Sequence, residues 1–187
     1  VNGTLTITKA TLTATADNKS RGYGDTNPTF TVTYAGFKNS ETSSVIDTSP
    51  TASSTATATS NVGTYNIVAA GGTDNNYSFT YVNGTLTINK AALTAPADNK
   101  IRLYGDANPA FTLTYTGFKN SETSSVIDTA PLATTTATIT NNVGAYNIIA
   151  AGGVDNNYSF TYVNGTLTIT KATLTATADN KSRGYGD

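Results

Sequence analysis

The residues best able to do chemistry in this sequence gather in the segment DNKSRGYGD, at residues 17–25. It holds two acids and two bases within a short span: Asp17, Lys19, Arg21 and Asp25. Such a set could form a binding site or an acid–base pair. The same residues also suit a strand that enters a turn, because glycine accepts positive φ and aspartate accepts hydrogen bonds from nearby backbone amides.

A near copy of the segment, DNKIRLYGD at residues 98–106, helps to choose between these interpretations. Ser20 of the first copy is replaced by Ile101, and Gly22 is replaced by Leu103. The two positions lie two residues apart, so they share one face of a strand. A catalytic cluster would not readily accept these replacements, and the sequence therefore favours a structural role.

The opposite face of this strand carries an arginine and a tyrosine in each copy, Arg21 with Tyr23 and Arg102 with Tyr104. We expect the tyrosines to be core anchors and the arginines to lie on the surface with their stems covered. A packed core does not accept leucine in place of glycine without strain. We therefore expect Ile101 and Leu103 to lie outside the main core, facing solvent, a sheet edge or the adjoining unit.

Other chemistry is limited by the residue types that are missing. The chain has no cysteine and no histidine, which excludes thiolate chemistry, Cys-type zinc sites and a Ser–His pair. The loops GGTDNN and GDTNP could bind calcium, but they lack the closely spaced carboxylates that calcium prefers, so we interpret them as turns. Glu41 and Glu122 could assist a Lys–Asn or Lys–Asp isopeptide bond, but each is better placed to begin a short helix. No catalytic, cofactor or metal residue is predicted.

Composition and charge exclude several partners. Hydrophobic residues make up 37% of the chain, charged residues make up 12%, and the net charge is −1. No basic block suggests nucleic-acid binding. No apolar run approaches the roughly 20 residues of a spanning helix, so we expect no membrane insertion in this segment. Abundant threonine, tyrosine and valine favour strands.

The chain is periodic. VNGTLTI begins at residues 1, 82 and 163, which gives a period of 81 residues, and 63 of 81 positions are identical between the two full copies. Repeats of this kind indicate a tandem array. We predict four segments: the last strand of a preceding repeat (1–9), repeat domain 1 (10–90), repeat domain 2 (91–171) and the first strand of a following repeat (172–187).

Alternating residues predict a small β domain with an inward-facing set. In the first repeat this set is Leu12, Phe30, Val32, Tyr34, Phe37, Val45, Ile46, Tyr65, Ile67, Phe79, Tyr81, Leu86 and Ile88. Residues 39–47 predict a short helix capped by Asn39 or Ser40. Asn83-Gly84 predicts a type I′ hairpin between residues 77 and 89; the alternative is one long strand with a glycine bulge.

The junction between repeats lacks flexible residues. From Thr85 to Lys100 there is no glycine and a single proline, Pro96. The last strand of one repeat therefore runs almost directly into the first strand of the next, unlike a Gly/Ser linker. We expect an array that forms an extended rod.

The motifs YGD.NP.FT.TY.GF.NSETSSVI, NVG.YNI and NYSFTYVNGTLTI resemble the MBG-type repeat with the Tyr-Gly signature. The resemblance covers both full repeats. It implies a small β-grasp-like domain; the alternative is an Ig-like β-sandwich. In such repeats the short helix starts at NGDT, and Ser40 and Ser121 here replace its glycine.

Such repeats occur in giant bacterial surface adhesins, including gliding-motility and type IX-secreted adhesins of Bacteroidetes. The resemblance therefore implies an extracellular stalk, not an enzyme, that holds a distal binding region away from the bacterial cell. Its partners would be the neighbouring repeats of the same chain. The alternative is that the repeats themselves bind host or surface glycans, or mucin, weakly and multivalently.

Overall fold

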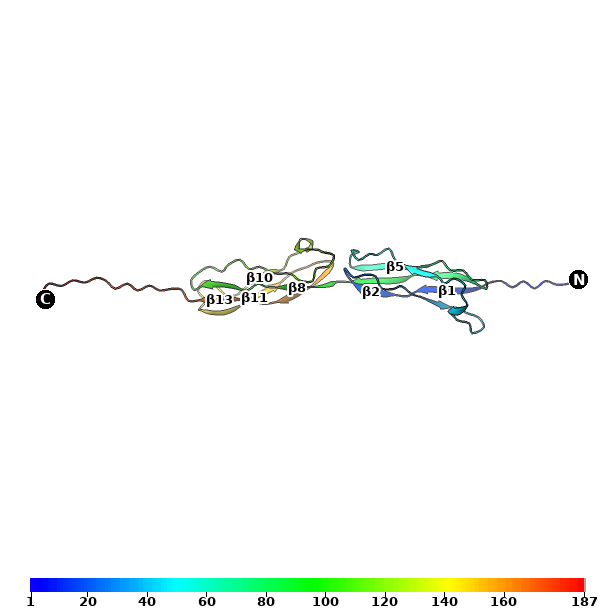
Figure 1. The fold of residues 1–187 in the computed structure, drawn as a ribbon, viewed down its shortest axis with the longest axis horizontal. Coiled ribbons are helices and arrows are strands. Elements are labelled where there is room, and N and C mark those ends of the chain that lie inside the picture. Colours follow the sequence, from blue (N-terminus) through cyan, green and yellow to red (C-terminus); the bar gives the residue numbers. More distant parts are fainter. Residues whose placement is uncertain (187) are drawn as a thin grey trace. The chain divides into compact units, whose positions relative to one another are not determined.

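The computed structural model describes residues 1–186 and is mainly β-structure (Figure 1). The chain forms two compact units that do not follow the sequence repeats. Unit 1 contains Val1–Thr94, Tyr115–Ala130 and Gly153–Thr161, and unit 2 contains Ala95–Thr114, Pro131–Gly152 and the chain from Tyr162. Unit 1 therefore includes the whole first repeat together with three segments of the second.

The first repeat folds into two sheets. One sheet has the order β3-β1-β6 and the other has the order β2-β7-β5-β4. The strands are β1 (Ala10–Ala16), β2 (Lys19–Gly22), β3 (Val32–Ala35), β4 (Thr51–Ser53), β5 (Gly63–Ala70), β6 (Tyr77–Val82) and β7 (Gly84–Asn89). Two sheets without a long helix correspond to the sandwich alternative more closely than to a β-grasp domain.

The first strand of this repeat, β1 continued by β2, and its last strand, β6 continued by β7, both pass from one sheet to the other. β1 pairs with β6 in parallel, from Ala10 opposite Tyr77 onward, and β2 pairs with β7 in parallel in the second sheet. The chain crosses between the sheets after β1 and again after β6, so the two crossings lie next to each other. Figure 1 shows β1 and β2 following one another along the first repeat.

The predicted hairpin at Asn83-Gly84 is wrong. β6 and β7 lie in different sheets and do not pair, and neither Asn83 nor Gly84 has the positive φ that a type I′ turn requires. A Cβ at Gly84 would instead clash with the carbonyl of Ala16 and meet the Asp17 oxygen at 3.0 Å. Glycine is required here because two backbones cross at close range.

The predicted short helix is a single 3-10 turn. It spans Ser43–Val45, and Thr42 precedes it without a side-chain capping bond. Asn39 and Ser40 therefore do not cap it. They are the central residues of a tight turn, with φ of 55° and 58°, closed by the hydrogen bond from the Glu41 amide to the Lys38 carbonyl at 2.9 Å.

The second repeat has counterparts of these elements except β3, whose place is taken by isolated bridges between Thr94 and Thr116 and between Ala97 and Leu113. The counterparts are β8 (Ala91–Pro96), β9 (Lys100–Leu103), a 3-10 turn (Ser124–Val126), β10 (Leu132–Thr134), β11 (Gly144–Ala151), β12 (Tyr158–Val163) and β13 (Gly165–Thr170). Its strand orders are β12-β8 and β10-β11-β13-β9. Within the described residues, 1–9 and 171–184 form no helix or strand.

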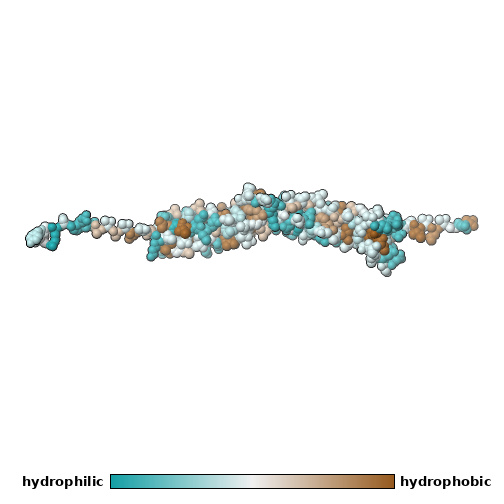
Figure 2. Space-filling model, viewed as in Figure 1, coloured by the Kyte–Doolittle hydropathy of each residue, from teal (hydrophilic) through white to brown (hydrophobic). Residues whose placement is uncertain are grey.

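The core of the first repeat is smaller than predicted. Leu12, Ile67, Leu86 and Ile88 are fully buried, as expected from the alternation. The other predicted core residues are partly buried or exposed, and the predictions for Val45 (41% exposed) and Tyr81 (40% exposed) are wrong. Val45 lies in the 3-10 turn, none of whose residues is buried. In the view of Figure 2, hydrophilic and neutral residues cover most of the visible face.

Candidate functional site

The segment DNKSRGYGD begins where the chain leaves β1, and its first side chains secure the crossing between the sheets. Asp17 accepts hydrogen bonds from the hydroxyls of Thr31 and Thr33. The bond from Thr31 is the main cause that lowers the pKa of Asp17. The Oδ1 atom of Asn18 accepts a hydrogen bond from the amide of Thr85 at 2.7 Å. This bond lies in the interval between the β1–β6 and β2–β7 ladders, so it links the first strand to the last where neither ladder does.

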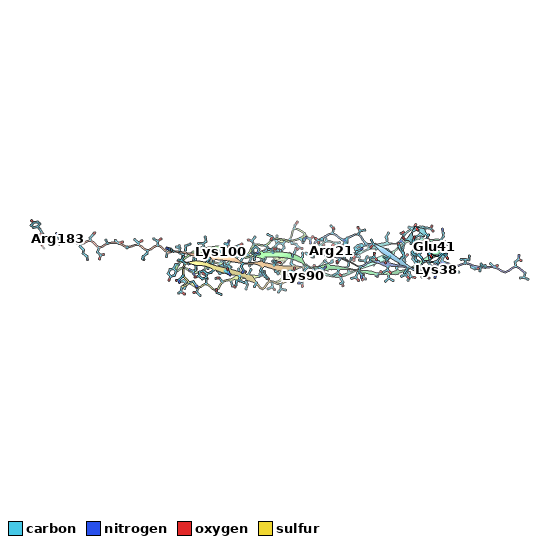
Figure 3. All side chains as sticks on the ribbon, turned by 90° about the horizontal axis from the view of Figure 1, so that it is seen from below. Arg21, Lys38, Glu41, Lys90, Lys100 and Arg183 are labelled. Atoms are coloured by element: carbon cyan, nitrogen blue, oxygen red, sulfur yellow. The ribbon has the colours of Figure 1, made fainter. Side chains whose placement is uncertain are left out.

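The guanidinium of Arg21, which Figure 3 labels, organises the following turn. The residue is only 8% exposed. It donates to Asn27 Oδ1 at 2.7 Å, to the Gly22 carbonyl at 3.0 Å and to the Thr57 carbonyl at 2.5 Å. Asn27 in turn donates to the carbonyl of Ala56. The prediction of a surface arginine is therefore wrong, because the guanidinium donates from all three of its nitrogens to fixed oxygens and can be buried with these hydrogen bonds in place.

Tyr23 is buried, as predicted, but by residues that belong partly to the second repeat and lie in the same compact unit. Its hydroxyl donates to Glu122 Oε1 at 2.6 Å. Its ring meets that of Tyr158 edge-on, with centroids 5.5 Å apart. Tyr158 donates to the other oxygen of Glu122 at 2.5 Å. One carboxylate therefore accepts two phenols, one from each repeat.

Three further contacts surround this pair. Lys119 Nζ lies 3.0 Å from Asp25 Oδ1 in an exposed salt bridge. Gly24, at φ +80°, lies against Lys119, and a Cβ there would clash with that side chain. The amide of Val62 donates to Asn157 Oδ1 at 3.0 Å. We call this contact the junction, formed by Tyr23, Gly24, Asp25 and Val62 on one side and by Lys119, Glu122, Asn157 and Tyr158 on the other.

The second copy of the segment makes the same internal contacts. Asp98 accepts from the hydroxyls of Thr112 and Thr114, and Asn99 accepts from the Thr166 amide at 2.7 Å. Arg102 is 6% exposed, and its bonds to Asn108 and to the Leu103 and Thr138 carbonyls repeat those of Arg21. These side chains therefore shape each repeat from within.

The last three residues of the second copy differ in their surroundings from those of the first. Tyr104 is 47% exposed, so its predicted burial is wrong, and a Cβ at Gly105 would meet nothing within 4 Å. Asp106 has no salt bridge within residues 1–186. Ile101 and Leu103 are 71% and 47% exposed, which confirms that they lie outside the core.

The acceptor side of the junction has a counterpart in the first repeat. Tyr77 donates to Glu41 Oε2 at 2.6 Å and accepts a hydrogen bond from the Lys38 amide at 2.8 Å. Lys38 and Glu41 lie close together in Figure 3. The Glu41 bond is the main cause that raises the pKa of Tyr77, whereas burial is the main cause for Tyr23 and Tyr158, with Glu122 second.

The role of these glutamates was not predicted from the sequence. Each was expected to begin a helix, but no acidic residue lies in the first turn of either 3-10 element. Residues 36–48 of the first repeat are identical to residues 117–129 of the second, so no substitution between the copies pointed to the glutamate. The role of Asn18 at the crossing was missed for the same reason.

The Asp/Asn-rich loop before β6 is held by its aspartate. Asp74 is buried, and its Oδ1 accepts hydrogen bonds from the amides of Asn76 and Tyr77 at 2.7 and 2.9 Å. These bonds lower its pKa, with that from Asn76 contributing most. Lys9 Nζ donates to the backbone carbonyl of Asp74, not to its carboxylate. Residues 1–186 contain no group of three or more acidic side chains that could hold a metal ion.

Comparison with known proteins identifies the repeats. Residues 12–87 and 93–168 each match the MBG domain (YGX type). No curated protein matches the chain. The helical elements of residues 1–186 are too short to cross a membrane. The Tyr-Gly pair of this domain type is Tyr23-Gly24 in the first repeat, at the centre of the junction. The chain belongs to the MBG domain family of the YGX type and carries two such domains in tandem.

Proposed function

We propose that this chain is a stalk segment of a long bacterial adhesin or filament, located outside the cell, and that it is not an enzyme. The observation that carries the proposal is the junction, where Glu122 accepts hydrogen bonds from Tyr23 and Tyr158. A connection of this kind suits repeats whose role is to hold a fixed geometry. The two strands at the connection, β7 and β8, are separated by Lys90 alone.

Small-angle scattering tests this proposal. Chains of two and four repeats would be compared, and the radius of gyration should grow almost in proportion to repeat number, because each repeat adds the length of its long strands at about 3.3 Å per residue along the strand. A radius that grows only as that of a compact globule, about the 0.38 power of length, would contradict a spacer function.

The proposed location needs a separate test. The resemblance to surface adhesins, including those of gliding and type IX-secreting Bacteroidetes, supports an extracellular position. Antibodies raised against the two repeats should label intact cells of the source bacterium as strongly as permeabilised cells. Labelling that requires permeabilisation would contradict the proposal.

A second candidate function rests on one aromatic pair. The rings of Phe79 and Tyr81 are stacked, with centroids 6.3 Å apart and 21° between the planes, and Tyr81 is 40% exposed. Exposed aromatic faces of this kind suit sugar rings, which supports weak multivalent binding of glycans. A glycan-array screen, with Tyr81→Ala as the control variant, would test this candidate.

A further inference from the structure

The first and last strands of the first repeat lie side by side and run in the same direction. The ladder begins with Ala10 opposite Tyr77 and continues in the second sheet until Gly22 lies opposite Asn89. Both ends are closed by backbone hydrogen bonds of 2.8 Å, from the Ala10 amide to Asn76 and from the Tyr23 amide to Asn89. The first and last strands are therefore joined at both ends and, through Asn18 and Thr85, at the crossing.

This arrangement fixes how the repeat bears a pulling force. The chain enters the ladder at Ala10 and leaves it at Asn89, and these residues lie at opposite ends of the ladder. Tension along the chain would slide the two strands past each other. Sliding strains all the bonds of the ladder together, whereas pulling two facing residues apart breaks the bonds one after another.

Buried side chains protect the ladder from water. Leu12 and Ala14 of β1, and Leu86 and Ile88 of β7, are all at most 1% exposed. Water that could replace a strained backbone bond is therefore excluded from one face of each sheet. A hydrogen bond in such surroundings is costly to break without replacement.

We propose that β1–β2 and β6–β7 form a mechanical clamp that resists force applied along the chain. The clamp goes beyond the stalk function and does not depend on it, because the pairing would resist force even in a spacer that never carries load. Forced unfolding is governed by the unfolding rate, so the clamp acts by raising the barrier to strand separation.

Single-molecule pulling between engineered cysteines tests the clamp, because the chain contains no natural cysteine. Thr11→Cys with Asn89→Cys loads the ladder from opposite ends. Thr11→Cys with Ser78→Cys loads it from two facing residues. All three positions are exposed, so both variants should fold, which denaturant unfolding would verify. We expect the first pair to require a several-fold higher unfolding force than the second. Equal forces, or a higher force for the facing pair, would overturn the clamp.

A third variant probes the crossing. Asn18→Ala removes the bond to Thr85 from an exposed side chain. It should lower the unfolding force for the Thr11–Asn89 pair and leave the first force peak of the Thr11–Ser78 pair unchanged, because peeling begins at Thr11 and Ser78, before it reaches the crossing. An equal loss in both geometries would show that Asn18 only stabilises the fold. Neither result would alter the scattering test of the spacer function.

Discussion

Tyr23 and Tyr104 occupy the same position in two nearly identical segments, yet one is 4% exposed and the other is 47% exposed. The strands and arginines that precede them are arranged alike, with Arg21 and Arg102 making matching hydrogen bonds. The difference lies in the residues that cover the tyrosine. Glu122 and Tyr158 contact Tyr23, whereas Tyr104 has no corresponding contact within residues 1–186.

The comparison separates two kinds of residue within the segment. Asp17, Asn18 and Arg21 keep their contacts in both copies, so they serve the fold of the individual repeat. The side chains of Tyr23 and Asp25 also bond to Glu122 and Lys119 of the next repeat, and Gly24 lies against Lys119, so these residues serve the connection. Within nine residues, the segment therefore contains both side chains that complete the fold of its own repeat and side chains that contact the next repeat.

The largest expected difference in stability is between variants that lack the tyrosine of the first segment copy and variants that lack the tyrosine of the second. Tyr23→Ala should lower the free energy of unfolding by about 3–5 kcal/mol, as removal of a large buried ring does. Tyr104→Ala should cost less than about 1 kcal/mol, because its ring is half exposed. Urea unfolding of the two variants measures the difference. Equal losses would show that the contacts of Tyr23 in the junction add nothing to the free energy of unfolding.

The adjacent glycines sharpen the comparison. Gly24 and Gly105 have φ of +80° and +86°, so alanine should cost each about 1–2 kcal/mol through backbone strain. At Gly24 the added methyl also clashes with Lys119, which should cost about 1–3 kcal/mol more. Thermal unfolding of Gly24→Ala and Gly105→Ala would isolate the contribution of the junction. The prediction is wrong if Gly105→Ala is the more damaging change.

Alkaline pH should weaken the junction. The pKa of Tyr23 and of Tyr158 is raised in the folded protein, chiefly by burial and then by the Glu122 carboxylate. Above the ordinary pKa of about 10, unfolded tyrosines lose their protons first, so stability is complete below that pH and falls as the pH rises. Tyr23→Phe should make this fall shallower than in the unchanged protein. Urea unfolding at a series of pH values would measure both slopes, and a slope unchanged by Tyr23→Phe would contradict the assignment.

The smallest effect should be the same in both repeats. Ser40 and Ser121 have φ of 58° and 60°, where glycine is favoured over other residues. Ser40→Gly and Ser121→Gly should each stabilise the chain by up to about 1 kcal/mol, because both turns have the same geometry. Differential scanning calorimetry would measure the gains. A marked difference between the two variants would show that the repeats are not equivalent away from the junction.

Much of this arrangement could be predicted from the sequence. The period of 81 residues defined the repeats, and alternation placed Leu12, Leu86 and Ile88 in the core. The substitutions Ser20 to Ile101 and Gly22 to Leu103 correctly indicated a face outside the core. These signals are local or arise from differences between copies, and both kinds are visible in a single chain.

The remaining features depend on contacts distant in sequence. Asn83-Gly84 has the composition of a hairpin turn, but its glycine is needed because the chain passes the carbonyl of Ala16, 68 residues earlier. Glu122 accepts from Tyr23 across 99 residues. No local pattern distinguishes such an acceptor from a helix-start residue, so the junction could be recognised only from the structure.

The central claim is that Tyr23 and Glu122 are coupled and Tyr104 is not. A double-mutant cycle with Tyr23→Phe and Glu122→Gln, measured by urea unfolding, tests it most directly. A phenol bonded to a carboxylate should give a coupling energy of about 1–3 kcal/mol. The matched cycle with Tyr104→Phe and Glu122→Gln should give none. A coupling near zero in the first cycle, or equal couplings in the two, would contradict the junction.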